Sequence, residues 1–98
     1  MLASTIDPEG RRVVLTEDRW LHIKDEHPML ASRMREVMAA VREPTRRLPG
    51  RVEAEEWCFA NEALPGMWLQ VVVHYEGGEG WIVTAFPREF PRASPRRR

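Results

Sequence analysis

The spacing of hydrophobic side chains changes near Pro44, and this change constrains the fold more than any other feature of the sequence. Before Pro44, apolar residues recur every three or four positions, which is typical of one face of a helix. This apolar stripe consists of Leu30, Met34, Val37, Met38 and Val41. After Pro44, the apolar and aromatic runs are short, contain strand-forming residues and are separated by glycine and proline. The sequence therefore predicts helices first and a sheet second.

The strand-like part contains a hairpin signal. Residues 67–75 and 81–86 are runs of apolar and aromatic residues, and the glycine-rich residues 77–80 join them. Glycine readily adopts the positive φ angles of tight hairpin turns, so the two runs are expected to pair in antiparallel fashion. A further short strand is expected at residues 56–60.

Two helices are expected before Pro44. Thr16 is a good capping residue, and the two acidic residues after it suit the positive end of a helix that would run to about Glu26. Pro28 is tolerated at a first helical position, so a second helix is expected to begin there. The predicted fold class is α+β, with two N-terminal helices packed on a three- to four-stranded antiparallel sheet.

Length and composition predict one domain. The chain has 98 residues, of which 43% are hydrophobic. We expect an irregular segment at residues 1–10, a single α+β domain at 11–90 and a flexible basic tail at 91–98. Because no apolar run approaches the roughly 18–20 residues of a membrane helix and no secretory signal is visible, we expect a cytoplasmic protein without membrane association. The single cysteine, Cys58, excludes an internal disulfide and a cysteine-based zinc site, and we expect neither metal nor cofactor.

The charged residues balance overall but are unevenly distributed. Fifteen basic and fifteen acidic groups are present, and all the basic groups except Lys24 are arginine. Four of the arginines lie in the last seven residues, so residues 1–91 carry an excess of four acidic groups. The basic tail is either a solvated terminus or an aid to binding phosphate backbones. The acidic body argues against a protein that coats nucleic acid, so any contact with RNA is expected to be local.

Two of the three histidines, His22 and His27, lie five residues apart near the end of the first predicted helix. Histidine can gain or lose a proton near neutral pH, which makes acid–base chemistry a candidate. At about 100° per residue the two rings lie roughly 140° apart, which argues against joint chelation of a metal. His27 shares the apolar face with Trp20 and Ile23, an arrangement that also suits a partly buried structural residue.

Three arginines and one threonine are candidates for phosphate contacts. Arg46 and Arg47 follow the second predicted helix, and Arg88 follows the last predicted strand. A guanidinium can bind a phosphate through two parallel hydrogen bonds, although solvated arginine is the alternative for each. Thr84 is the polar residue in an apolar strand, where its hydroxyl can contact a phosphate or water, or the residue can simply favour strand geometry.

The order of these motifs resembles a known family. The motifs are Trp20-x-His22-Ile23-x-x-x-His27-Pro28, a helix ending at Pro44, Trp57-Cys58-Phe59, Leu69-Gln-Val-Val-Val73 and Ile82-Val83-Thr84-Ala85-Phe86. Over about residues 13–90 they resemble the phage-type nuclease-like domains of the barnase–EndoU–colicin–RelE group. This resemblance implies two N-terminal helices, a four-stranded antiparallel sheet and a metal-independent endoribonuclease, often a toxin or part of a phage protein. It places His22 and His27 in the helical motif and Thr84 in the last-strand motif, whereas the basic position has no single match.

The resemblance implies that the 2′-hydroxyl of RNA is the nucleophile. One group must take the 2′ proton and another must protonate the departing 5′ oxygen, each contributing about 10²–10⁴-fold. This hypothesis assigns the acid–base role to His27 or His22, phosphate stabilisation to Arg46 or Arg47, and substrate positioning to Thr84. RNA and a separately encoded antitoxin or immunity protein are the expected partners. The alternative is a non-catalytic binding domain with the same fold, which the acidic body favours.

Overall fold

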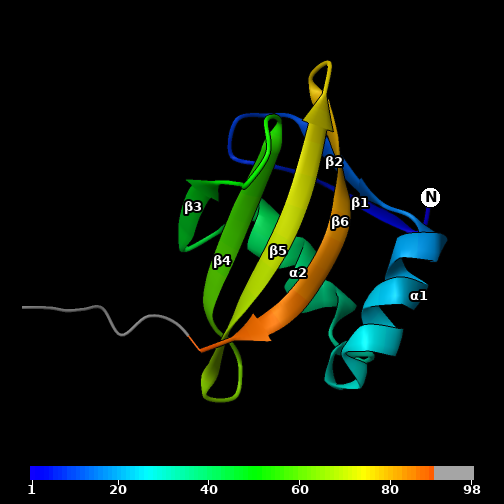
Figure 1. Cartoon of the computed structure of the whole chain (residues 1–98), viewed down its shortest axis with the longest axis vertical. Helices are drawn as coiled ribbons and strands as arrows, with labels where there is room; N and C mark the ends of the chain where they lie inside the picture. Colours follow the sequence, from blue (N-terminus) through cyan, green and yellow to red (C-terminus); the bar gives the residue numbers. More distant parts are fainter. Residues whose placement is uncertain (90–98) are drawn as a thin grey trace, which may run out of the picture.

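A computed structural model describes residues 1–89 of the protein. Its centre is one six-stranded sheet with the order β1-β2-β6-β5-β4-β3 (Figure 1). The strands are β1 (Ala3–Ile6), β2 (Arg12–Leu15), β3 (Arg46–Pro49), β4 (Glu55–Leu64), β5 (Met67–Glu76) and β6 (Glu79–Arg88). The helices are α1 (Glu17–Glu26) and α2 (Met34–Arg42), with the short 3-10 helix η1 (Pro28–Leu30) between them. The expected basic tail at 91–98 lies outside the described residues.

The observed sheet corrects the predicted fold class. The prediction of a three- to four-stranded antiparallel sheet is wrong, because the sheet has six strands and is mixed, with β2 parallel to β6. Two strands also precede the helices, and β1 lies within residues 1–10, which were expected to be irregular. The strands β1, β2 and β3 have four residues each. Such short segments carry little periodic signal, so their pairing becomes visible only in the tertiary structure.

The helix signals are confirmed for α1 and partly for α2. The Thr16 side chain accepts a hydrogen bond from the backbone N–H of Arg19 at 3.2 Å and so caps α1. Pro28 begins the 3-10 helix η1 rather than an α-helix, and α2 therefore begins later than expected, at Met34. The hairpin of β5 and β6 is confirmed, and its turn residues Gly77 and Gly78 both have positive φ angles, 63° and 90°.

The hydrophobic core lies between the helices and one side of the sheet, which we call the inner face. Figure 1 shows α2 across β4 and β5, while α1 lies beside β6. The predicted stripe of α2 buries Val37 and Val41 completely. From the sheet, Val71 and Val73 point into the same core. Complete burial of such aliphatic side chains stabilises the fold by about 1.5–3 kcal/mol each.

The opposite side of the sheet, which we call the outer face, is not covered by a helix within residues 1–89 (Figure 1). Successive side chains of a strand point to opposite faces. Because Val71 and Val73 point into the core, Gln70 and Val72 must point to the outer face. Within the described residues, neither helix is long and apolar enough to cross a membrane.

Candidate functional site

The registers of the long strands arrange side chains of the outer face in rows. Directly opposite residues of an antiparallel pair lie on the same face, with Cβ atoms about 4.5–5.5 Å apart. One row crosses four strands, because Arg46 lies opposite Phe59, which lies opposite Gln70, which lies opposite Phe86. His27 extends this row, since its ring centroid is 5.9 Å from that of Phe86. We call these five residues the histidine row.

Thr84 and Arg88 lie on either side of the histidine row along β6. Thr84 is opposite Val72, and Arg88 is opposite Trp68. Both are two residues from Phe86, a distance of about 6.6–6.8 Å along a strand, and therefore share its face. Thr84, Phe86 and Arg88 thus follow one another along the outer face of β6.

A β-bulge in β6 decides that these side chains face outward. Thr84 pairs with Val72, but Ile82 already pairs with Val73, so Val83 is an extra residue between them. Ile82 is fully buried in the core, whereas Val83 and Thr84 are both half-buried. In a regular strand Thr84 would share the inward direction of Ile82. The bulge therefore directs Thr84 and the residues after it to the outer face.

Gln70 is a buried polar residue at the centre of the histidine row. Its side chain is almost completely buried, with 1% of the residue exposed, between the opposite residues Phe59 and Phe86. A buried amide needs a hydrogen-bond partner, and Gln70 Oε1 accepts one from Arg88 Nη1. This bond fixes a guanidinium beside the histidine row, where its planar fork suits a phosphate.

Beside the histidine row the outer face contains an open groove of about 330 Å³. Trp57, Val72, Val83 and Phe86 supply its apolar and aromatic lining. The exposed Val52, from the loop before β4, also lines the groove. An uncovered aromatic surface of this kind can bind a flat apolar group.

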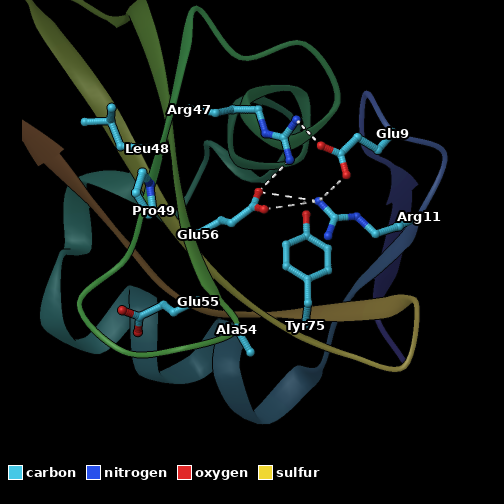
Figure 2. Close-up of a pocket in the computed structure, with 9 residues that line it drawn as sticks. All are labelled: Glu9, Arg11, Arg47, Leu48, Pro49, Ala54, Glu55, Glu56 and Tyr75. Atoms are coloured by element: carbon cyan, nitrogen blue, oxygen red, sulfur yellow. Dashed lines mark hydrogen bonds and ion pairs between the residues drawn. The ribbon is translucent and has the colours of Figure 1, made fainter.

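A second cavity, of about 350 Å³, lies on the inner side of β3 and β4 and is lined by a network of charged residues (Figure 2). Arg47 donates one hydrogen bond to Glu56 at 2.5 Å and another to Glu9 at 3.3 Å. Arg11 lies between Glu9 and Glu56 and stacks on the Tyr75 ring, with its guanidinium carbon 3.6 Å from the ring centroid. The cations of this cavity are therefore paired with carboxylates of the same chain.

The charge network continues to the buried residue Asp7. Its Oδ2 atom accepts hydrogen bonds from Arg11 Nε at 2.8 Å and from the Tyr75 hydroxyl at 2.7 Å. Burial raises the pKa of Asp7, but the hydrogen bonds from Arg11, Tyr75 and Glu9 outweigh it and leave the pKa below its usual value. The pKa of Tyr75 is raised, by burial first and by Asp7 second. The network thus links the β1–β2 turn to β4 and β5, and its role is to stabilise the fold.

Cys58 lies next to this network without taking part in its hydrogen bonds. It is buried, and its burial raises the pKa of the thiol to about 11. A thiol with such a pKa is protonated at neutral pH and is therefore a poor nucleophile. Cys58 functions as a core residue.

The structure brings three of the six predicted site residues, Thr84, Arg46 and Arg88, to the outer face. A fourth, His27, lies at the end of α1 in ring contact with Phe86 of that face. The other two lie elsewhere: Arg47 belongs to the charge network on the opposite side of the sheet, and His22 is half-buried within α1, outside the histidine row. Sequence reasoning missed Gln70 as a site residue. Its signal was present, since it is a lone amide within the apolar run of β5.

Among residues 1–89 no group of three or more histidine, cysteine, aspartate or glutamate side chains is placed to hold a metal ion. In the comparisons with known proteins, no family model, no curated protein and no solved structure matches this chain. The resemblance to the barnase–EndoU–colicin–RelE group therefore stays a prediction from the motifs.

Proposed function

We propose that the protein is an endoribonuclease that binds RNA on the outer face of its sheet and cleaves it without a metal ion. The observation that supports this proposal is the histidine row, whose member His27 contacts Phe86 and whose member Gln70 binds the neighbouring Arg88 on the outer face. Thr84 lies next to this row on β6. A proton-transfer group, a cation and a hydroxyl are the side chains that cleavage by an internal nucleophile needs.

The reaction begins with attack of the 2′-hydroxyl oxygen on the adjacent phosphorus. The O2′–P bond forms while the P–O5′ bond breaks, the 2′ proton passes to a base, and the 5′ oxygen receives a proton from an acid. His27 performs one of these proton transfers, and water on the open face performs the other. Arg88 offsets the charge on the phosphate oxygens, and Thr84 positions the phosphate. Arg46 lies three strands away from Phe86, roughly 14 Å, and contacts another phosphate of the same RNA strand. The products are a 2′,3′-cyclic phosphate and a 5′-hydroxyl.

The distribution of charge supports RNA binding on this face. Several acidic groups of the neutral chain, including Asp7, Glu9 and Glu56, belong to the charge network and are paired with arginines there. Arg46 and Arg88 lie on the outer face, among aromatic side chains. Arginines bind the RNA backbone, and exposed aromatic rings stack on bases.

This proposal includes the partners and the cellular location of the protein. The substrate is RNA in the cytoplasm, and a separately encoded antitoxin or immunity protein would inhibit the enzyme by covering the outer face. The second candidate is a non-catalytic binding domain that uses the same face. A cleavage assay separates the two functions.

The test incubates purified protein with labelled single-stranded and structured RNA in EDTA. We expect cyclic-phosphate ends from the wild type, and a loss of rate of about 10²-fold or more in His27→Ala, because a proton-transfer group is removed. His22→Ala separates the two histidines and is expected to retain most of the activity, since His22 lies outside the histidine row. His74→Ala is the matched control, because His74 stacks on Trp81 two rows away, with ring centroids 4.7 Å apart.

Two results would overturn the proposal. If His27→Ala cleaves RNA at the wild-type rate, His27 does not transfer a proton in the reaction. Absence of cleavage for every RNA tested, with a folded wild-type protein, would leave the binding domain as the function of this face.

A further inference from the structure

The groove on the outer face has a chemistry that the proposed cleavage reaction does not use. Trp57 and Val72 face Thr84 across neighbouring strands, and the bulge residue Val83 joins them on the same side. With Phe86 they surround the groove of about 330 Å³, next to the histidine row. None of these apolar side chains can transfer a proton, so the cleavage reaction gives them no chemical role, and we assign them a binding role.

The size and lining of the groove suit one flat aromatic group. Small-molecule pockets have volumes of about 300–1,000 Å³, and this groove is at the lower end of that range. Trp57 and Phe86 are half-buried, so both rings present part of their surface to a ligand. Stacking of a base on an aromatic side chain contributes about 1–3 kcal/mol and tolerates any base.

Two arginines and one glutamate carry the charges in and beside the groove, an excess of one positive charge. Arg51 lines the groove itself, and Arg88 lies farther along β6 on the same face. The acidic residue of the lining, Glu55, already accepts a hydrogen bond from the backbone N–H of Arg51 at 2.9 Å. An aromatic lining with arginines beside it complements a base joined to phosphates, and it leaves the arginines without an anion if an apolar peptide binds.

We infer that this groove is the subsite for one unpaired base of the RNA, next to the phosphate that the histidine row holds. This inference rests on the proposed function and specifies its substrate as single-stranded RNA. In an A-form duplex the bases are stacked and paired, so none can enter the groove. The protein is thus specific for single-stranded RNA, and it cleaves beside a base that Trp57 stacks on.

The test measures binding separately from cleavage. A fluorescent single-stranded RNA with a 2′-deoxy residue at the cleavage position cannot react, and its binding is followed by fluorescence anisotropy. Relative to the free single strand, we expect the affinity of the wild type to be lower by about tenfold or more when that strand is paired in a duplex. We expect a similar loss of affinity when the strand lacks the base that enters the groove. Trp57→Ala should weaken binding of the intact strand by about 5- to 100-fold, whereas Trp57→Phe retains most of the affinity.

Matched variants exclude a loss of folding. Trp81→Ala makes the same change on the same face but outside the groove, and is expected to bind within about twofold of the wild type. Val52→Asp places a negative charge in the groove at a side chain that is 58% exposed, and it should weaken binding without unfolding the protein. Leu21→Asp is its control on α1, at a side chain that is 55% exposed.

The outcomes separate the inference from the proposed function. If the wild type cleaves RNA but Trp57→Ala and Val52→Asp bind and cleave like the wild type, the subsite is wrong and the proposed function stands. If those variants lose binding while the wild type cleaves no RNA, the base subsite stands and the catalytic proposal falls. Equal binding of duplex and single strand by the wild type would overturn the inference.

Discussion

His27 owes its position to its sequence neighbour Pro28 and to a contact across the fold. A residue before proline avoids the α-helical region, and His27 has φ −138° and ψ 78° as the C-cap of α1. Its backbone N–H still donates to the carbonyl of Ile23 at 2.8 Å. The ring then lies beside Phe86 of β6. The end of the helix follows from Pro28, whereas the neighbour of the ring follows from the packing of α1 beside the last strand.

The first prediction concerns the bond between Gln70 and Arg88. Gln70→Leu removes the acceptor of Arg88 Nη1 but keeps an apolar side chain of similar size between Phe59 and Phe86. We expect the stability of the fold to change little and the KM for RNA to rise by about 10- to 150-fold, because a hydrogen bond to a charged group contributes about 1.5–3 kcal/mol. The value of kcat should fall less than kcat/KM. Urea unfolding and steady-state cleavage give the two readouts.

A double-mutant cycle checks that Gln70 acts through Arg88. In an Arg88→Ala background, Gln70→Leu should have no further effect on the KM for RNA. Additive effects of the two substitutions would mean that Gln70 does not position Arg88.

At the scale of elements, the two short-range signals at the ends of α1 determine where it begins and ends. Thr16 caps its first turn, and Pro28 lies two positions after its last residue, Glu26. The bulge in β6 is different, because no glycine or proline marks Val83 as an extra residue. The bulge arises because Ile82 pairs with Val73 and points into the core, while Thr84 pairs with Val72 and points to the outer face.

The second prediction concerns the cap of α1. Thr16→Ala removes the oxygen that accepts the Arg19 N–H, and we expect the free energy of unfolding to fall by about 1 kcal/mol, within a range of about 0.5–2. Thr16→Ser keeps a capping hydroxyl and is expected to remain within about 0.5 kcal/mol of the wild type. Chemical denaturation monitored by circular dichroism provides the measurement. Equal loss in both variants would show that the methyl group, and not the cap, stabilises this turn.

For the whole molecule, the charge network connects segments that are far apart in the sequence. Asp7 is buried at 4% exposure and bonded to Tyr75, 68 positions away. A buried carboxylate stabilises the fold only while it is paired and hydrogen-bonded. The same network holds the carboxylates of Asp7, Glu9 and Glu56 on the side of the sheet away from the outer face.

The third prediction is an acid-dependent loss of stability. The pKa of Asp7 is lower in the folded protein than its usual value of 3.8, so its contribution is fully present above that value and is lost as the pH falls through the lowered folded pKa. Urea midpoints measured from pH 7 to pH 2 should therefore fall below about pH 4. Asp7→Asn should lower the free energy of unfolding at pH 7 by about 1–3 kcal/mol and weaken this acid dependence.

Asp25→Asn serves as the matched control for Asp7. Asp25 is exposed on α1, so this substitution is expected to leave both the stability at pH 7 and its acid dependence close to those of the wild type. The same acid dependence in Asp7→Asn and in the wild type would assign the effect to other carboxylates.

The sequence by itself determined the elements whose signals are local. The cap at Thr16, the apolar stripe of α2 and the Gly77–Gly78 turn each depend on residues within a few positions of one another, and all three are confirmed. It also marked His27, Thr84, Arg46 and Arg88 as candidate site residues. Nothing in the sequence indicated that the last three share the outer face, or that the ring of His27 contacts Phe86 there. Their role in a reaction stays a prediction.

Only the tertiary structure decided the order of the sheet and the composition of the outer face. The four-residue strands β1, β2 and β3 are each too short to show a period, and they become strands by pairing with partners elsewhere in the chain. The extra residue Val83 reverses which face the end of β6 presents, and thereby separates Thr84 from the core. Which strands pair, and to which face of the sheet a side chain points, depend on contacts between residues that are distant in the sequence. A pattern of residues along the chain does not show these contacts.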